Sequence, residues 1–452
     1  DPIGTPNCAS STSVSISMCL RSSGGDLLLV VEERRCGMDV VVDRCAALDV
    51  HLKTVQACVR VTGEAGKREE RSRGFDTFTQ GLRALRNWLK TEEVTQVAME
   101  ATGVYWRPVW YMLQDLEGVE LLLVNARHVK NVPGRKTDAK DAQWLCQLLE
   151  CGLLKGSFVP TEAMQKLRDL TRYRTRMVKD RGSEVQRIHK VLEDAGLKLE
   201  AVISDVLGVS GRKMLEALIV GERSPDVLAE MSMRRMRSKI PTLNLALEGH
   251  FGEHHAVMAR LHLDHIDYLD AAIDRVEQEV DELMAPFKEA VEHLVTIPGI
   301  ATTTAHVVVA EIGVDMSRFP TADHLASWAG LCPGNYESAG KSRSGKTSKG
   351  NPALASAMCE AAWAASRTKD TYLSEQFKRF LRRFGRRGAN KAIVALAHTM
   401  IVIVWHVLAN QTDYLDLGPD FFRRLDNPEA QKQRLIRQLE ALGLEVTVQP
   451  AA

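Results

Sequence analysis

Four acidic residues are spaced so that they could bind metal ions. Asp49 lies in a β-branched segment, Glu100 directly follows another apolar segment, and Asp138 and Asp141 stand three residues apart at the start of a predicted helix, where they share one face. Crowded carboxylates repel each other unless cations neutralise them, and hard cations such as Mg2+ or Mn2+ prefer oxygen ligands. The spacing therefore predicts a metal site for phosphoryl transfer, although helix caps and strand-end carboxylates explain the same residues without a metal.

A basic, glycine-containing loop could supply a nucleophile. The segment 330–341 contains Ser338, and lysines and arginines follow it closely. Neighbouring cations and a metal ion can lower the pKa of a hydroxyl and stabilise a pentavalent phosphorus. Ser338 is the candidate, and Ser342, Ser344 and Ser348 remain alternatives by composition.

The same loop satisfies the phosphate-binding pattern G-x-x-x-x-G-K-T over residues 340–347. A P-loop requires a buried strand directly before the pattern and a helix directly after it. Here a Pro-Gly-Asn-Tyr-Glu stretch precedes the pattern and Ser-Lys-Gly-Asn-Pro follows it. The context therefore disfavours a nucleotide triphosphatase.

Basic residues gather around and after this loop. Between Gly334 and Lys391 there are 13 Lys/Arg and 4 Asp/Glu, although the whole chain has a net charge of only +1. Residues 165–190 are also basic, and residues 264–292 are acidic. We expect the following side chains to bind nucleic-acid phosphates, with a solvated helix end as the alternative for the later ones: Lys341, Arg343, Lys346, Lys349, Arg379, Arg382, Arg383, Arg386, Arg387 and Lys391.

The histidines and cysteines do not form a recognisable zinc motif. Five histidines between residues 250 and 265 have neither a thiolate partner nor an H-E-x-x-H spacing, so we expect a solvated helix face. The nine cysteines include no C-x-x-C pair, which is typical of reduced thiols in a cytoplasmic protein. We expect no membrane-spanning segment, because His398, Thr399 and His406 interrupt the longest apolar run, residues 392–408.

The elements that position these residues change along the chain. Strands are predicted over 46–61, 94–99 and 119–124, and helices over 75–89, 104–116 and 138–149. This alternation indicates an α/β domain with partly parallel strands. Amphipathic helices follow over 161–286 and form an antiparallel arm, either a coiled coil of the kind that builds dimers or an ordinary solvated bundle.

The C-terminal part is predicted to be mainly helical. A Pro-Gly turn at 297–300 resembles half of a phosphate-binding helix-hairpin-helix, and apolar helices are expected over 304–312, 325–329, 354–365, 373–383 and 389–408, with a loop over 332–351. We therefore expect a disordered extension over 1–37, an α/β domain over 38–160, an arm over 161–290, a C-terminal domain over 291–420 and a peripheral tail over 421–452.

Three short motifs carry a family resemblance. Leu48-Asp49-Val50-His51, Met99-Glu100-Ala101-Thr102-Gly103 and Lys136-Thr137-Asp138-Ala139-Lys140-Asp141-Ala142 together resemble the DEDD transposases of the insertion sequence 110 family, in particular its 1111 subgroup. The resemblance implies a RuvC-like, ribonuclease H-like first domain with Asp49, Glu100, Asp138 and Asp141 as metal ligands. It also implies a C-terminal transposase domain in which Ser338 is the catalytic serine, here followed by Ala339 where a glycine is usual.

The resemblance further implies the reaction and the partners. Donor and target DNA would be cut and rejoined through a covalent phosphoserine intermediate, with a non-coding bridge RNA as guide. The protein would act as a homo-oligomer, from dimer to tetramer, without a membrane partner. The alternative from the carboxylates alone is a Mg-dependent, structure-selective nuclease similar to Holliday-junction resolvases, which would hydrolyse DNA with water.

Overall fold

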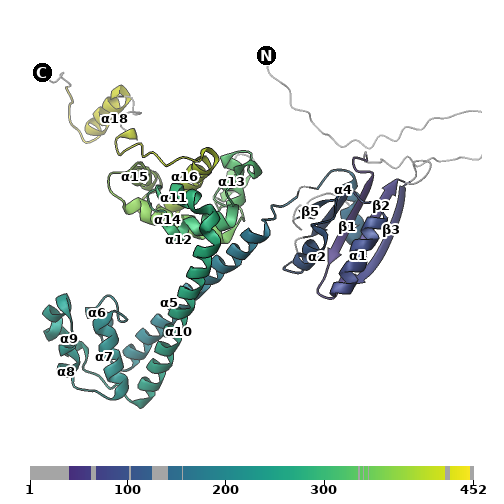
Figure 1. Cartoon of the computed structure of the whole chain (residues 1–452). Helices are drawn as coiled ribbons and strands as arrows, with labels where there is room; N and C mark the ends of the chain where they lie inside the picture. Colours follow the sequence, from purple (N-terminus) through teal and green to yellow (C-terminus); the bar gives the residue numbers. More distant parts are fainter. Residues whose placement is uncertain are drawn as a thin grey trace, which may run out of the picture. The chain divides into compact units, whose positions relative to one another are not determined.

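The computed structural model describes residues 40–62, 68–100, 103–124, 141–154, 156–333, 336–338, 341–344, 346–422 and 428–447 (Figure 1). The chain divides into two compact units, Asp1–Ser157 and Phe158–Ala452. The extension expected over 1–37 lies outside the described residues. The further boundaries expected near 290 and 420 remain predictions.

The first unit contains a mixed five-stranded sheet in the order β3-β2-β1-β4-β5. Its strands are β1 (Arg44–Val50), β2 (Thr54–Thr62), β3 (Arg68–Asp76), β4 (Gln96–Glu100) and β5 (Glu120–Val124). The first three pair antiparallel, whereas β4 and β5 join β1 in parallel through the helices α1 (Thr79–Thr91) and α2 (Trp106–Leu113). The prediction of an α/β unit with partly parallel strands is confirmed.

Two predictions within this sheet were wrong. The segment 46–61 is two strands rather than one, because the chain turns after Val50, where the backbone N–H of His51 donates to the carbonyl of Thr54 at 2.9 Å. Strand β3 was missed because six of its nine residues are exposed and charged or polar, so it shows no apolar alternation. It lies at the edge of the sheet, where charged side chains are common.

The second unit begins with two long antiparallel helices, α5 (Glu162–Asp194) and α10 (Glu253–Met284), so the predicted helical arm is confirmed (Figure 1). Ion pairs join them, including Arg174–Glu277 and Arg181–Asp270. The basic segment of the sequence thus pairs with the acidic one at two positions within a single chain. Between the two helices lie α6 (Leu199–Val202), α7 (Val209–Val220), α8 (Pro225–Glu230), the 3-10 helix η3 (Arg234–Lys239) and α9 (Ile240–Ala246).

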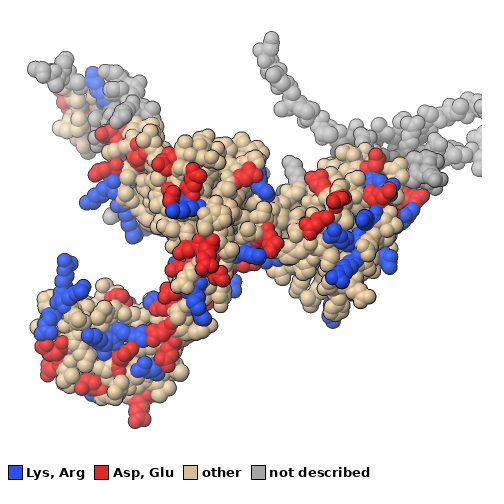
Figure 2. Space-filling view, in the orientation of Figure 1, with Lys and Arg blue, Asp and Glu red and all other residues tan. Residues whose placement is uncertain are grey.

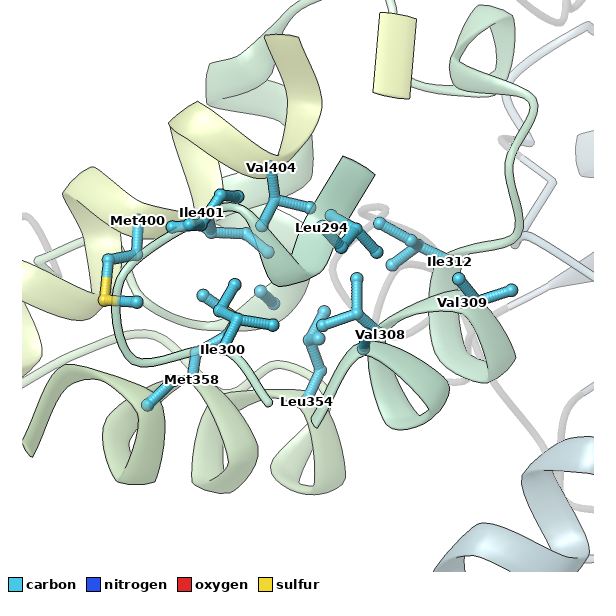
Figure 3. Close-up of a cluster of buried hydrophobic side chains, with 14 of the residues drawn as sticks. Leu294, Ile300, Val308, Val309, Ile312, Leu354, Met358, Met400, Ile401 and Val404 are labelled. Carbon is cyan, nitrogen blue, oxygen red and sulfur yellow. The ribbon is translucent and has the colours of Figure 1, made fainter. Parts of the chain in front are cut away.

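The remaining elements form a helical core around α16 (Ala389–Asn410) (Figure 3). They are η4 (Ala285–Phe287), α11 (Lys288–Val295), α12 (Thr302–Ile312), η5 (Met316–Arg318), α13 (Ala322–Ala329), α14 (Pro352–Arg367), α15 (Tyr372–Phe384) and η6 (Arg386–Gly388), with α18 (Pro428–Glu440) in the tail. The predicted helices are confirmed. The predicted loop over 332–351 instead contains two short strands, β6 (Tyr336–Ser338) and β7 (Lys341–Ser344).

The expectation that no segment has the length and hydropathy of a membrane span is wrong for helix α16. Its 22 residues include an 18-residue window with a mean hydropathy of 2.2, and no other helix in the described part of the chain passes the same criterion. Half of that window is buried, with Leu396, Met400 and Val404 fully enclosed by neighbouring helices. A helix that is apolar on most faces is also what the centre of a large helical core requires.

The Pro-Gly turn before α12 faces the core. Gly299 has a φ of +92°, and a Cβ at this position would lie 2.4 Å from the carbonyl oxygen of Ala361 and 2.7 Å from the amide nitrogen of Ala365. Ile297 and Ile300 on either side are buried. The glycine therefore allows the turn to pack against the backbone of α14, so packing explains it without the predicted phosphate contact.

We predict that Gly299→Ala lowers the free energy of unfolding by about 2–4 kcal/mol, since the substitution adds a backbone clash to an unfavourable φ. Gly221→Ala is the matched control: Gly221 has a φ of +113° but no atom within 4 Å of the added Cβ, so only about 1 kcal/mol should be lost. Thermal and denaturant unfolding measure both changes. Equal losses would show that the close approach to α14 is not the cause.

Candidate active site

Asp49 and Glu100 occupy adjacent positions on neighbouring parallel strands. The register pairs Cys45 with Gln96 and continues to Leu48 with Met99, so the next residue on each strand is a carboxylate. Parallel strands lie about 4.8 Å apart, and side chains in register share a face of the sheet. The sheet therefore brings these two predicted site residues together at the carboxyl ends of β1 and β4.

Helix α4 (Asp141–Glu150) covers the same face of the sheet and brings a third carboxylate. The sulfur atoms of Cys45 and Cys146 lie 3.8 Å apart, and the last residue of the helix, Glu150, accepts a hydrogen bond from the amide of Val41 just before β1. The helix thus runs antiparallel to β1. Its first residue, Asp141, is consequently at the end where the two strands terminate in Asp49 and Glu100.

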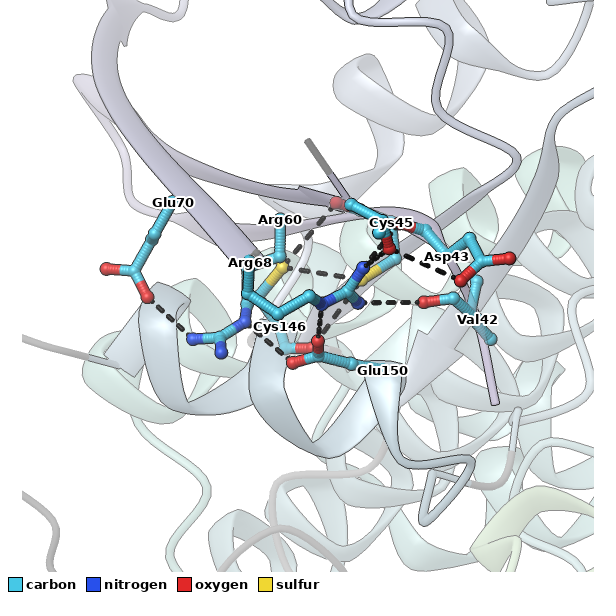
Figure 4. A network of polar contacts seen from close by, with 9 residues as sticks. Val42, Asp43, Cys45, Arg60, Arg68, Glu70, Cys146 and Glu150 are labelled. Carbon is cyan, nitrogen blue, oxygen red and sulfur yellow. Dashed lines mark hydrogen bonds and ion pairs between the residues drawn. The ribbon is translucent and has the colours of Figure 1, made fainter. Parts of the chain in front are cut away.

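A buried ion-pair network holds the opposite end of α4 (Figure 4). The Glu150 side chain is only 4% exposed and lies 2.7 Å from Nε of Arg60, while Arg68 pairs with its other oxygen. Arg68 also donates to the backbone carbonyls of Asp43, at 2.8 Å, and Val42, at 3.1 Å. The carboxylate thereby connects α4 to β2, β3 and the start of β1, which fixes the position of the helix on the sheet.

Three buried thiols fill the space between α4 and the sheet. Cys45, Cys58 and Cys146 are fully enclosed, and none of the described cysteines forms a disulfide, in agreement with the expectation of reduced thiols. Hydrogen bonding with Cys45 and Cys58, together with burial, raises the pKa of Cys146 far above its ordinary value. Cys146 therefore keeps its proton and acts as a small packing residue.

The Asp49 carboxylate is partly open to solvent and has a histidine partner. Its side chain is 24% exposed, and Nε2 of His51 lies 3.1 Å from its Oδ2. His51 stands within the motif that carries the family resemblance, but the sequence did not suggest a role for it. The D-x-H spacing across the end of a strand is the signal that could have identified it.

The fourth predicted ligand, Asp138, lies outside the described residues. Among the residues that the structure describes, no group of three or more Asp, Glu, His or Cys side chains is arranged to hold a metal ion. The histidines between residues 250 and 265 form no such group either. His262 and His265 contact the buried carboxylate of Glu184. The donors that the sheet and α4 do bring to one edge are all carboxylates, which suit a hard divalent cation.

The predicted nucleophile lies in the β6–β7 hairpin. Ser338 ends β6, and the register pairs it with Lys341 at the start of β7. Strand β7 also holds Ser342 and Ser344, whereas the Oγ of Ser348 is buried and has no hydrogen-bond partner in the described structure. A buried hydroxyl cannot reach a phosphodiester, so the structure disfavours Ser348.

The hairpin also excludes the P-loop interpretation. Residues 341–344, in the middle of the G-x-x-x-x-G-K-T pattern, form a strand that pairs antiparallel with β6. Helix α14 begins only at Pro352, five residues after Thr347. The pattern therefore lacks the strand-loop-helix geometry that wraps backbone amides around phosphates.

The two ends of the hairpin meet at a close backbone contact. A Cβ on Gly350 would lie 2.2 Å from the amide nitrogen of Gly330, and one on Gly330 would lie 2.6 Å from that of Gly350. Pro333 and Thr347 form an antiparallel bridge just beyond this contact. Both ends are thus fixed to one point beside α13 and α14.

A second buried carboxylate holds the end of this hairpin. Glu311 on α12 is fully buried and accepts two hydrogen bonds from Arg172 of α5, at 2.6 and 2.8 Å. It also accepts one at 2.6 Å from the side-chain amide of Asn351, whose own oxygen caps α14 by accepting from the amides of Ala353 and Leu354. Neither Glu311 nor Asn351 was predicted from the sequence, because a glutamate within an apolar helix carries no local signal of its partners.

The predicted phosphate-binding residues divide into two groups. Lys346 and Lys349 are exposed beyond β7, and the side chains of Lys341, Arg343 and Arg386 are outside the described structure. The second group lies on α15, η6 and the start of α16, where Arg379, Arg382, Arg383, Arg387 and Lys391 are exposed. Within the described ranges, Arg382, Arg387 and Lys391 have no carboxylate at ion-pair distance, so their positive charge faces solvent uncompensated.

Comparison with known proteins finds two family models that match this chain, one over the carboxylates and one over the serine hairpin. Residues 46–196 match a transposase family model, that of the DEDD transposases of IS110, and residues 291–380 match the model described as transposase of the IS116/IS110/IS902 family. The chain belongs to the IS110 family of transposases. The first match contains the four predicted carboxylates, and the second contains Ser338.

Individual relatives of this IS110-family chain agree with the models. A probable family 20 transposase of Pseudomonas aeruginosa is 27% identical over 322 residues, covering 70% of this chain and 85% of the relative. The transposase for insertion sequence element IS1111A of Coxiella burnetii is 26% identical over 320 residues, covering 70% and 79%. The protein is therefore a DNA transposase, as the three motifs predicted.

We predict that Glu311→Ala lowers the free energy of unfolding by about 3 kcal/mol, because it leaves Arg168, Arg172 and Asn351 without their buried partner. Trypsin should then cleave the hairpin at Lys346 or Lys349 faster than in the parent protein. Glu162→Gln, which changes an exposed carboxylate paired with Lys166, should alter stability by less than about 0.5 kcal/mol. Unchanged cleavage in Glu311→Ala would show that the hairpin does not depend on this carboxylate.

Proposed function

We propose that the protein cuts and rejoins DNA through a covalent link to Ser338, assisted by a divalent metal ion. The observation that carries this proposal is the placement of Asp49 and Glu100 side by side on parallel strands, with Asp141 at the start of the helix that covers the same face. Together with the sheet order β3-β2-β1-β4-β5, this placement supports a RuvC-like, ribonuclease H-like first unit. The four carboxylates, including Asp138, would hold Mg2+ or Mn2+.

The metal, when bound, supplies positive charge that polarises the scissile phosphate and stabilises the charge that develops on it. The hydroxyl of Ser338 attacks the phosphorus, the bond to the leaving DNA oxygen breaks, and the serine proton ends on that oxygen. A second DNA hydroxyl then attacks the phosphoserine and regenerates Ser338. Each step exchanges one phosphoester for another, so the reaction requires no ATP.

The other chain residues have supporting roles in this proposal. The Gly330–Gly350 contact and the Glu311–Asn351 hydrogen bond hold both ends of the serine hairpin. Lys346, Lys349 and the exposed cations of α15, η6 and α16 bind the phosphates of DNA or RNA.

A guide RNA and a homo-oligomer of two to four subunits complete the proposal. Both rest on the family resemblance. A guide would deliver sequence specificity through base pairing, so that the protein need bind only backbone and shape. Purification with bound nucleic acid, followed by sequencing, tests the guide, and sedimentation of the purified complex tests the oligomer.

We predict that Ser338→Ala abolishes the covalent protein–DNA adduct while metal binding persists. Denaturing electrophoresis of a trapped reaction with labelled DNA measures the adduct. Ser342→Ala is the matched control on β7 and should retain it. Loss of the adduct only in Ser342→Ala or Ser344→Ala would move the nucleophile, and metal-dependent hydrolysis that survives every serine change would favour the resolvase-like alternative.

We predict that Asp49→Asn weakens Mn2+ binding at least about tenfold and abolishes adduct formation, because the substitution removes a charged oxygen ligand. Titration calorimetry or Mn2+ electron paramagnetic resonance measures the affinity. Asp115→Asn, at an exposed carboxylate between α2 and β5, outside the three motifs, should leave both properties unchanged. Equal Mn2+ affinity in all three proteins would contradict the assignment of Asp49.

A further inference from the structure

The helices between α5 and α10 carry an exposed cluster of positive charge. Four of the six residues of η3 are basic, namely Arg234, Arg235, Arg237 and Lys239, and all four are exposed. Figure 2 shows Lys and Arg side chains gathered at the edge of these helices, beside α9. The cluster is not evident from regional charge counts, because residues 198–250 also contain seven acidic residues.

Two residues of the cluster, Arg234 and Arg235, differ in their partners from Arg237, which pairs with Glu230 at 2.9 Å, and from several arginines of α5 and α7. Arg174 and Arg181 of α5 pair with carboxylates of α10, and Arg212 of α7 forms two hydrogen bonds with Asp267 of α10, at 2.8 and 2.6 Å. In the described structure, neither Arg234 nor Arg235 has a carboxylate within ion-pair distance. These two guanidinium groups therefore remain available to an external anion.

The two arginines stand on an ordered segment. The amide of Met233 donates to Oγ of Ser210 at 3.0 Å, and Met236 packs against the buried core of the surrounding helices. Lys239 donates to the carbonyl of Val202 at 2.6 Å. Arg234 has a φ of +52°, a left-handed conformation that persists in a non-glycine residue only where the surroundings impose it. Because the backbone that carries the two arginines is already ordered, only their side chains lose conformational entropy when they bind an anion.

We propose that η3 is a second nucleic-acid contact, in which Arg234 and Arg235 bind the phosphodiester backbone of DNA or RNA. This inference rests on the proposed function, since it assumes that the protein handles nucleic acid during transposition. The fork of each guanidinium matches phosphate oxygens, and the contact reads charge rather than base sequence. Three of the α10 carboxylates, Asp267, Asp270 and Glu277, already have arginine partners within the chain, which reduces the charge that a second copy could offer to η3.

The test is the double variant Arg234→Gln/Arg235→Gln in the full chain. Fluorescence anisotropy measures its binding to a duplex DNA and, separately, to a structured RNA of equal length between about 50 and 200 mM salt. We expect affinity to fall about tenfold near physiological salt, and the slope of log K against log salt to decrease by about 2 for duplex DNA, because two phosphate contacts are lost. The nucleic acid that shows the loss identifies the partner.

The control is Lys166→Gln/Lys288→Gln, which makes the same change in net charge at two exposed lysines that are paired with Glu162 and Glu292. Binding should be nearly unchanged. Equal losses in both double variants, no loss in either, or reduced self-association without reduced nucleic-acid binding would each overturn the proposal. Adduct formation at saturating DNA reports on Ser338 independently, so its failure would overturn the proposed chemistry without bearing on η3.

Discussion

The buried ion pairs of Glu150 are the interaction on which the geometry of the first unit depends. A carboxylate enclosed by protein is stable only when cations and hydrogen bonds replace its water, and here Arg60 and Arg68 do so from two different strands. Because both strands and the helix contribute, α4 cannot slide along the sheet without exposing an uncompensated charge. The position of Asp141 relative to Asp49 and Glu100 follows from this constraint, together with the packing of the buried thiols.

Glu311 has an equivalent role in the second unit. It joins α5, α12 and the residue that caps α14, so a single buried charge connects the arm to the end of the serine hairpin. In the first unit the carboxylates Asp49, Glu100 and Asp141 are partly exposed, and in both units the carboxylates that fix the supporting elements, Glu150 and Glu311, are buried. Rigid support of this kind is what transesterification requires, because the attacking hydroxyl and the phosphate must be held in line.

Much of the fold was predictable, and the failures have physical reasons. Periodicity identified β4, β5 and the long helices because their buried faces are continuous and apolar. It missed β3, whose exposed edge position removes the alternation, and it merged β1 with β2 because a short polar turn separates two apolar strands. At the candidate site, the motifs pointed to Asp49 and Glu100, whose role remains a prediction, whereas Glu150 and Glu311 were missed because their partners lie far away in sequence. Charge counts were similarly incomplete, since they could not reveal that arginines of α5 pair with carboxylates of α10, whereas Arg234 and Arg235 of η3 pair with none in the described structure.

The close approach of Gly330 and Gly350 bears on which part of the amino-acid sequence can be altered without disturbing the core. The chain leaves the helical core at Gly330 and returns to it at Gly350, and these two residues are in contact. The hairpin between them is therefore joined to the core at a single point. Leu331 and Cys332, next to this contact, still pack in the core, so changes are expected to be tolerated only beyond the Pro333–Thr347 bridge and only while both contact positions remain glycine. The fold thus separates the packed core from the hairpin that it carries, and the contact offers protein engineers a junction at which one hairpin can be exchanged for another.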